Sequence, residues 1–178
     1  MLESGEEPQL GGHDQIITCF FSDVQDFSSF SEALKSRELV DLMNEYLTAM
    51  TDILQEEGGT LDKYIGDAIV AMFGAPVTLP EHALRACVAA HRMQLKQAEL
   101  RDKWKAAEGK WPEPVLKMRT RIGLNTGLTT IGNMGSQTRF NYTMMGDTVN
   151  LASRLESGAK QRGIDSMITH VTYKAAEE

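Results

Sequence analysis

Two apolar segments constrain the fold of this chain more than any other feature, because each delivers an aspartate where a strand is expected to end or turn. Residues 20–28 read FFSDVQDFS, and residues 63–70 read KYIGDAIV. On a rigid frame, Asp23 and Asp67 can be held side by side. Hard divalent cations such as Mg²⁺ take oxygen ligands and are usually held by one or two carboxylates, with water and substrate phosphate in the other positions. The two segments therefore predict the outline of a metal site.

The aspartates also have a simpler interpretation as structural residues. Asp26 opens the sequence DFSS, and Asp67 follows a glycine. Aspartate is common in turns and at helix N-termini, where its side chain accepts hydrogen bonds from nearby backbone amides. Both interpretations are open at this point, and residues further along the chain must decide between them.

The composition favours one globular domain. The chain has 178 residues, of which 42% are hydrophobic, and this suits a single core. The net charge is −7 and the basic residues form no runs, so the basic footprint of a nucleic-acid-binding protein is missing. A bound anionic nucleotide would need a cation or local positive charge. Cys19 and Cys87 have no CxxC spacing and are expected to be reduced core residues.

The first residues are expected to connect this domain to something else. Residues 1–14 are acidic, contain glycine and lack the basic and apolar regions of a secretory signal. No stretch approaches the roughly 18 apolar residues of a membrane-spanning helix. We therefore expect residues 1–14 to be a linker from an upstream module and residues 15–178 to form the domain.

Hydrophobic periodicity predicts the elements of the first half of the domain. The expected elements are a buried strand over 16–21, a helix over 31–57 that ends at Gly58-Gly59, strands over 60–65 and 68–73, and a helix from residue 81. Gly66-Asp67 is the expected two-residue hairpin loop between the two strands. In the helix that starts at residue 81, the apolar stripe is expected at positions 84, 87, 88, 91, 95 and 98. His91 falls on this stripe, which favours a packed core residue over a ligand.

The second half is expected to contain short strands and one further helix. A surface loop is predicted over 105–114, a strand over 118–124, a turn at Thr126-Gly127, a short strand over 129–132 and a flexible connection over 133–137. Strands over 140–145 and 164–169 enclose a helix over 149–156. On that helix Asn150 and Arg154 stand four residues apart and share a face. An arginine fork and an amide donor can bind a phosphate and a sugar oxygen together, whereas the alternative is an exposed helix with a surface arginine.

Four segments together resemble the catalytic domain of the class III adenylyl and guanylyl cyclases. They are residues 21–28 (FSDVQDFS), 62–68 (DKYIGDA), 121–127 (RIGLNTG) and 146–154 (GDTVNLASR), and they occur in the family's order. The resemblance implies an α+β fold, with a ferredoxin-like, mixed and largely antiparallel sheet and helices packed on it. It is strongest to the bacterial homodimeric adenylyl cyclases that have a threonine at the purine-reading position.

The resemblance also implies a role for each motif residue. Asp23, Asp67 and the backbone carbonyl of Val24 would bind two Mg²⁺ or Mn²⁺ ions, which activate the ribose 3′-hydroxyl and offset phosphate charge. Amides of the turn that contains Phe27 and Ser28 would bind the triphosphate.

The remaining motif residues would recognise the nucleoside and stabilise the transition state. Lys63 and Thr143 would recognise adenine, Asn150 would orient the ribose, and Arg154 would stabilise the pentavalent phosphorus. The implied activity is conversion of ATP to 3′,5′-cyclic AMP and pyrophosphate, at sites shared between the chains of a homodimer.

The resemblance leaves alternatives open. A guanylyl cyclase with unusual base-reading residues is one, and a catalytically inactive nucleotide-binding or dimerisation module is another. A nucleotidyltransferase that makes cyclic dinucleotides would instead carry a glycine-glycine-acidic signature at the hairpin tip. The family usually continues past residue 178 into a hairpin with a triphosphate-binding lysine, which this sequence does not contain. We expect a cytoplasmic catalytic domain, with a regulatory or membrane module upstream and an inner-membrane anchor in the parent protein.

Overall fold

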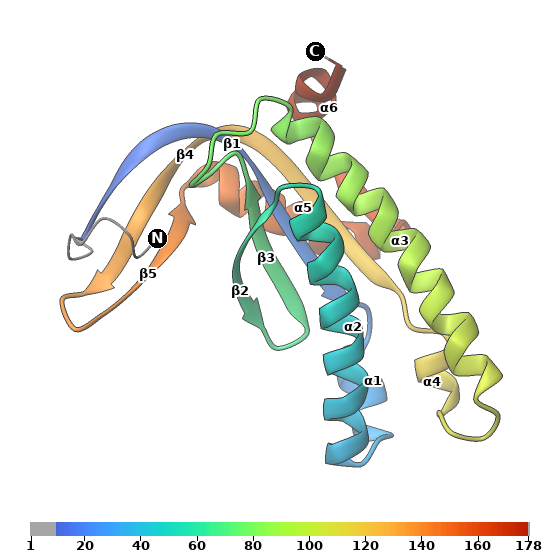
Figure 1. Ribbon diagram of the computed structural model, residues 1–178. Helices are drawn as coiled ribbons and strands as arrows, with labels where there is room; N and C mark the ends of the chain where they lie inside the picture. Colours follow the sequence, from blue (N-terminus) through green and yellow to red (C-terminus); the bar gives the residue numbers. More distant parts are fainter. Residues whose placement is uncertain (1–9, 178) are drawn as a thin grey trace.

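The computed structural model describes residues 10–177, so most of the expected linker, residues 1–9, lies outside the described part of the chain. Figure 1 shows a curved sheet with helices on both faces. In chain order, the elements are β1 (Gly11–Val24), α1 (Phe27–Glu32), α2 (Ser36–Glu56), β2 (Thr60–Ile65), β3 (Ala68–Phe73), α3 (His82–Ala106), α4 (Glu113–Leu116), β4 (Thr120–Ser136), β5 (Arg139–Met145), α5 (Asp147–Arg162), β6 (Ser166–Ile168) and α6 (His170–Glu177). No helix within residues 10–177 is long and apolar enough to cross a membrane.

The sheet confirms the predicted fold class. Its strand order is β2-β3-β1-β4-β5, and all these neighbours pair antiparallel. β6 adds the parallel pairing, against the first part of β4. The mixed, largely antiparallel sheet is therefore the one expected, with helices packed on it as predicted.

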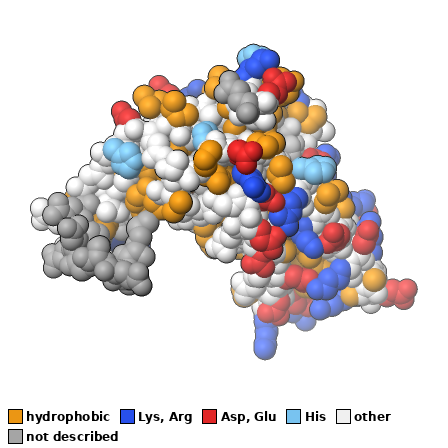
Figure 2. All heavy atoms as spheres, turned by 45° about the horizontal axis from the view of Figure 1, so that its top comes forward, with side chains coloured by type: hydrophobic (Ala, Val, Ile, Leu, Met, Phe, Trp, Pro, Cys, Tyr) orange, Lys and Arg blue, Asp and Glu red, His pale blue; other side chains and the backbone are white. Residues whose placement is uncertain are grey.

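β3 is buried on both faces of the sheet, and its sequence shows how this is achieved. Ile69, Ala71 and Phe73 belong to the core cluster that includes α2 and α3, whereas Val70 and Met72 belong to a second cluster that includes α5. Successive side chains of a strand point to opposite faces, so a run of apolar residues can pack against the helices on both sides of the sheet. In Figure 2 charged side chains gather over the helical part of the molecule, and few of them lie on the arching strands.

β1 and β4 are much longer than the sequence predicts. β1 begins at Gly11, so residues 11–14, expected in the linker, pair with β4. The predicted turn at Thr126-Gly127 and the predicted flexible connection over 133–137 are wrong, because β4 runs unbroken from Thr120 to Ser136. Glycine here permits close approach of neighbouring backbone. A Cβ on Gly132 would lie 2.0 Å from the carbonyl oxygen of Gly11.

The helices differ from the prediction in two ways. The expected helix over 31–57 is divided into α1 and α2, and α3 presents a different face to the core from the one expected. His91 is exposed, so its assignment to the core is wrong, and Leu84 and Leu95 are 40% and 54% exposed. The stripe that is buried instead consists mainly of small residues followed by larger ones: Ala83, Ala86, Ala89, Ala90, Met93, Gln97, Leu100 and Trp104. Alanines allow this helix to pack closely, and their low hydrophobicity hides the stripe from a periodicity argument.

Candidate active site

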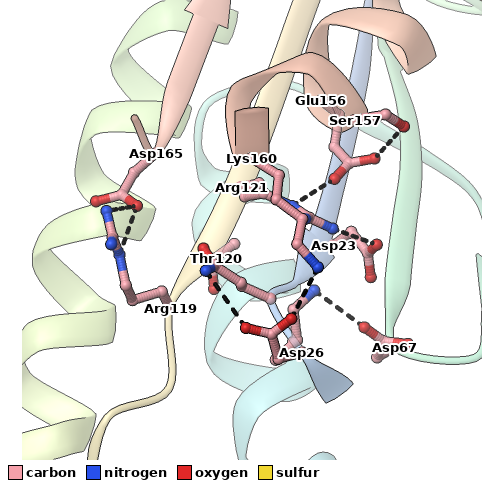
Figure 3. A network of polar contacts seen from close by, with 12 residues as sticks. Asp23, Asp26, Asp67, Arg119, Thr120, Arg121, Glu156, Ser157, Lys160 and Asp165 are labelled. Carbon is pink, nitrogen blue, oxygen red and sulfur yellow. Dashed lines mark hydrogen bonds and ion pairs between the residues drawn. The ribbon is translucent and has the colours of Figure 1, made fainter. Parts of the chain in front are cut away.

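The structure brings the two predicted carboxylates together. Asp23 lies near the end of β1, and Asp67 lies in the two-residue loop between β2 and β3, which confirms the predicted hairpin. The backbone N–H of Val24 donates to Asp67 Oδ2 at 3.0 Å (Figure 3). Burial raises the pKa of Asp67 above its ordinary value of 3.8, and the neighbouring Asp23 raises it further through a hydrogen bond and through its charge. A second carboxylate this close disfavours the ionisation of Asp67.

This donor set fits a hard divalent cation. It offers the oxygens of Asp23 and Asp67 with the backbone of Val24 beside them, and a cation there would relieve the repulsion between the two carboxylates. The set consists of oxygens only, which suits Mg²⁺ or Mn²⁺ better than the softer transition metals. The hydrogen bond that Asp67 accepts from the backbone of Val24 would also suit a purely structural turn residue. A turn residue, however, does not require a second carboxylate beside it, and Asp23 lies there.

A buried arginine joins this carboxylate pair to α5. Arg121 pairs with Asp23 in the register of β1 and β4, and its Nη2 donates to Asp23 Oδ2 at 3.0 Å. Its Nε donates to Glu156 Oε1 at 2.9 Å, and the Ser157 hydroxyl donates to the other oxygen of Glu156 at 3.3 Å. Burial raises the pKa of Glu156, and the charge of Asp23 adds to this effect. This link was not predicted from the sequence, although an arginine inside a strand of buried residues is a signal that a partner must lie nearby.

The turn after Asp23 contains the residues expected at the triphosphate. Asp26 precedes α1 with φ of 55°, and its side chain makes no capping hydrogen bond. It accepts instead from Lys160 of α5 at 2.8 Å. Phe27 packs edge-to-face on Phe30 with ring centroids 5.0 Å apart, and Ser28 is exposed in the first turn of α1. The turn is thus tied to α5 by an ion pair at the surface.

The expected base-reading residues meet, although they come from opposite ends of the strand order. Lys63 Nζ, on β2, donates to Thr143 Oγ1, on β5, at 3.3 Å. Thr143 Oγ1 in turn donates to Asp62 Oδ2 at 2.5 Å, and Lys63 Nζ lies 3.5 Å from Asp62 Oδ1. Asp62 was not predicted as a site residue from the sequence. Strand alternation would point it away from Lys63, but a register shift between Leu61 and Lys63 interrupts that alternation.

Asn150 and Arg154 stay apart from the carboxylates in this chain. Both are exposed on α5, and neither side chain makes a hydrogen bond or ion pair with another residue of the described range, 10–177. The position of α5 is fixed by its close approach to β4, since a Cβ on Gly123 would lie 2.4 Å from Ala152 O and from the backbone nitrogen of Glu156. The helix therefore holds the pair on a rigid element that faces solvent.

Comparison with known proteins decides the family. Residues 11–178 match the adenylate and guanylate cyclase catalytic domain. The chain belongs to this family. The resemblance that the four sequence segments indicate is thereby confirmed, and the cyclase fold accounts for the mixed sheet and its flanking helices.

Several relatives of this cyclase domain are known as sequences or structures. Adenylate cyclase 1 of Rhizobium meliloti is 35% identical over 162 residues, which make up 91% of this chain and 24% of that protein. The adenylate cyclase of Anabaena cylindrica is 36% identical over 153 residues, covering 86% of this chain and 29% of that protein. The chain thus spans about a quarter of the length of these curated relatives.

Two similar crystal structures have different printed activities. The adenylyl cyclase CyaB from P. aeruginosa matches with a TM-score of 0.83 and 37% identity, covering 94% of this chain and 83% of that one. The guanylyl cyclase Cya2 matches with a TM-score of 0.82 and 34% identity, covering 95% and 82%. The choice between adenine and guanine must therefore come from the side chains that meet the base.

Proposed function

We propose that this cyclase domain converts ATP to 3′,5′-cyclic AMP and pyrophosphate at sites shared between two copies of the chain. The choice of ATP as substrate rests on the contact between Lys63 Nζ and Thr143 Oγ1, which lie 3.3 Å apart. The ammonium can donate to the N1 acceptor of adenine, and the hydroxyl can accept from its exocyclic amine. Guanine presents the opposite pattern, and a buried mismatch of donors is poorly tolerated. Adenylate cyclases among the relatives support the same substrate.

Asp23, Asp67 and the carbonyl of Val24 would hold two Mg²⁺ or Mn²⁺ ions. Ions held there lower the pKa of the ribose 3′-hydroxyl and offset charge on the triphosphate. The contribution of Arg121 is to fix Asp23 in place through its contact with Oδ2. The first turn of α1, with Phe27 and Ser28, faces the triphosphate.

Asn150 and Arg154 serve the partner's site in this proposal. Asn150 orients the ribose, and the guanidinium of Arg154 stabilises the charge that develops around the α-phosphorus. Their exposure and their lack of a partner within residues 10–177 support a role across an interface. Ile16 and Leu128, opposite one another on β1 and β4, are 60% and 62% exposed, and such apolar surface supports burial in a homodimer.

The parent protein of this domain carries further modules in our proposal. The curated relatives are roughly three to four times as long as the segment they share with this chain. A regulatory or membrane module upstream of the domain, which itself lies on the cytoplasmic side, accounts for that difference.

Product formation tests the activity. The chain is incubated at high protein concentration with Mn²⁺ and either ATP or GTP, and the nucleotide formed is identified. Cyclic AMP from ATP is the expected result, whereas cyclic GMP from GTP alone would contradict the base assignment. No product from either nucleotide would favour an inactive module.

A pair of carboxylate variants tests the metal assignment. Asp67→Asn should reduce turnover at least about 100-fold, because metal stabilisation is worth several kcal/mol in the transition state. It should also weaken Mn²⁺ binding measured by electron paramagnetic resonance. Asp52→Asn, at an exposed position of α2, is the matched control and should change neither quantity. Equal effects of the two variants would remove Asp67 from the metal site.

A further inference from the structure

A buried carboxylate stands directly behind the threonine that is expected to read the base. The side chain of Asp62 is 1% exposed, and its Oδ2 accepts the hydroxyl hydrogen of Thr143 at 2.5 Å. Thr143 itself is 9% exposed. The ammonium of Lys63 lies 3.5 Å from the other oxygen of Asp62 and 3.3 Å from the threonine hydroxyl. The three side chains form a closed triangle of polar contacts.

The irregularity in β2 makes this triangle possible. The pairing of β2 with β3 shifts between Leu61 and Lys63, so Asp62 lies in the irregular step. In a regular strand neighbouring side chains point to opposite faces, but an irregularity of this kind re-aims one of them. Asp62 and Lys63 therefore both reach Thr143 on β5. The position of the carboxylate is set by the backbone of β2.

The hydrogen bond from Thr143 to Asp62 limits how the Thr143 hydroxyl can bind a base. A threonine hydroxyl carries one hydrogen and two lone pairs, and it rotates to suit its surroundings. A free hydroxyl could accept from the exocyclic amine of adenine or donate to the exocyclic oxygen of guanine. A carboxylate can only accept, so the hydrogen of Thr143 is committed to Asp62. The lone pairs are all that Thr143 can offer to a base.

We propose that Asp62 is a specificity-determining positioning residue, which makes the Thr143 hydroxyl an obligatory acceptor and so selects adenine over guanine. Asp62 acts through Thr143 and does not itself touch the nucleotide. The inference rests on the proposed function, because it assumes that Thr143 faces the base. It also explains why a threonine, whose hydroxyl is ambivalent on its own, can discriminate between the two purines.

The variant Asp62→Asn gives the sharpest test because it keeps the shape of the side chain. Lys63 has only donors to offer, so the amide oxygen of the asparagine turns toward it and the NH₂ group faces Thr143. Thr143 then accepts from that NH₂ group, and its own hydrogen is free to donate to the exocyclic oxygen of guanine. We expect the preference for ATP over GTP to fall about 10- to 100-fold, as the loss of one well-made polar contact implies.

The experiment measures kcat/KM for ATP and GTP with Mn²⁺, together with Kd for 3′-deoxy-ATP and 3′-deoxy-GTP, which bind without the attacking hydroxyl. The proteins are the unaltered chain, Asp62→Asn, Thr143→Val and the double variant. Asp62→Asn should shift both ratios toward guanine. In the Thr143→Val background the same substitution should leave both ratios unchanged, because Asp62 then has no hydroxyl to orient.

The outcomes distinguish a failure of the role of Asp62 from a failure of the proposed cyclase activity. A folded Asp62→Asn protein whose ratios stay within twofold of the unaltered chain would overturn the role of Asp62, and so would an equal shift with and without the Thr143 hydroxyl. If Asp62→Asn does not fold, Thr143→Val alone must lose the preference for adenine, or the inference fails. If the unaltered chain cyclises neither nucleotide, the proposed function fails, and the Kd ratios still decide whether Asp62 sets the base preference.

Discussion

Replacing Arg121 with leucine should destabilise the fold, because it leaves Glu156 buried without its cation. Arg121 and Glu156 are 7% and 8% exposed, and the guanidinium donates to Glu156 at 2.9 Å and to Asp23 at 3.0 Å. Removing one partner of a buried ion pair costs about 3–5 kcal/mol. The side chain of Asp23 is 30% exposed, so water can replace part of its contact, and the low end of that range applies.

The expected loss is therefore about 3 kcal/mol of unfolding free energy, or about 6–12 °C in Tm for a chain of this size. Urea unfolding followed by the fluorescence of the buried Trp104 measures it. Arg119→Leu is a matched control two residues away, since Arg119 pairs with Asp165 at 2.6 Å where both side chains are about 40% exposed. Figure 3 shows both arginines.

The control should lose less than about 1 kcal/mol, as exposed ion pairs do. Adding Glu156→Leu to Arg121→Leu should restore most of the lost stability, because the buried charge of Glu156 is then removed together with its partner. An Arg121→Leu protein no less stable than the Arg119→Leu control would refute the reasoning.

Two further predictions concern packing and charge. Gly123→Ala should cost about 1–3 kcal/mol in urea unfolding, because its Cβ would lie 2.4 Å from Ala152 O, whereas Gly158→Ala, with its nearest contact at 3.7 Å, should be neutral or stabilising. Hydrogen bonds from Arg92, and then from a second arginine, hold the pKa of Glu57 below its ordinary 4.5. The stability Glu57 adds is thus present above pH 4.5 and lost as pH falls further, so Glu57→Gln should destabilise the chain at pH 7 and progressively less in acid. A pH-independent difference would contradict this.

The sequence predicted the architecture well where local patterns determine it. The apolar run of β3 and the Gly66-Asp67 loop predict a hairpin from local sequence alone. Four motifs in order identify the family. The lengths of β1 and β4 were underestimated because glycine inside a strand has the same local signature as glycine in a turn. Gly132 is needed where two backbones approach closely, and that approach exists only in the folded sheet.

In the site, too, the residues placed by local patterns were predicted, and those placed by tertiary packing were not. Asp23 and Asp67 were expected to meet because each lies where a strand ends or turns, and the structure brings them together. Arg121 and Glu156 were missed because their contact depends on how α5 packs against β4. Asp62 was missed because only an irregularity in β2 turns it toward Lys63 and Thr143. The roles of the site residues stay predictions, and the experiments above test them.

The shared site is the central claim, and mixing two inactive variants tests it most directly. Asp23→Ala removes a metal ligand and Arg154→Ala removes the residue that the partner supplies. In an equal mixture, half the dimers would be mixed, and each would contain one intact site of two, so cyclic AMP formation should return to about a quarter of the unaltered rate. A mixture of Asp23→Ala with Asp67→Ala, which damage the same half-site, should stay inactive. Failure of the first mixture to recover at protein concentrations that support dimers would contradict the account, as would recovery in the second.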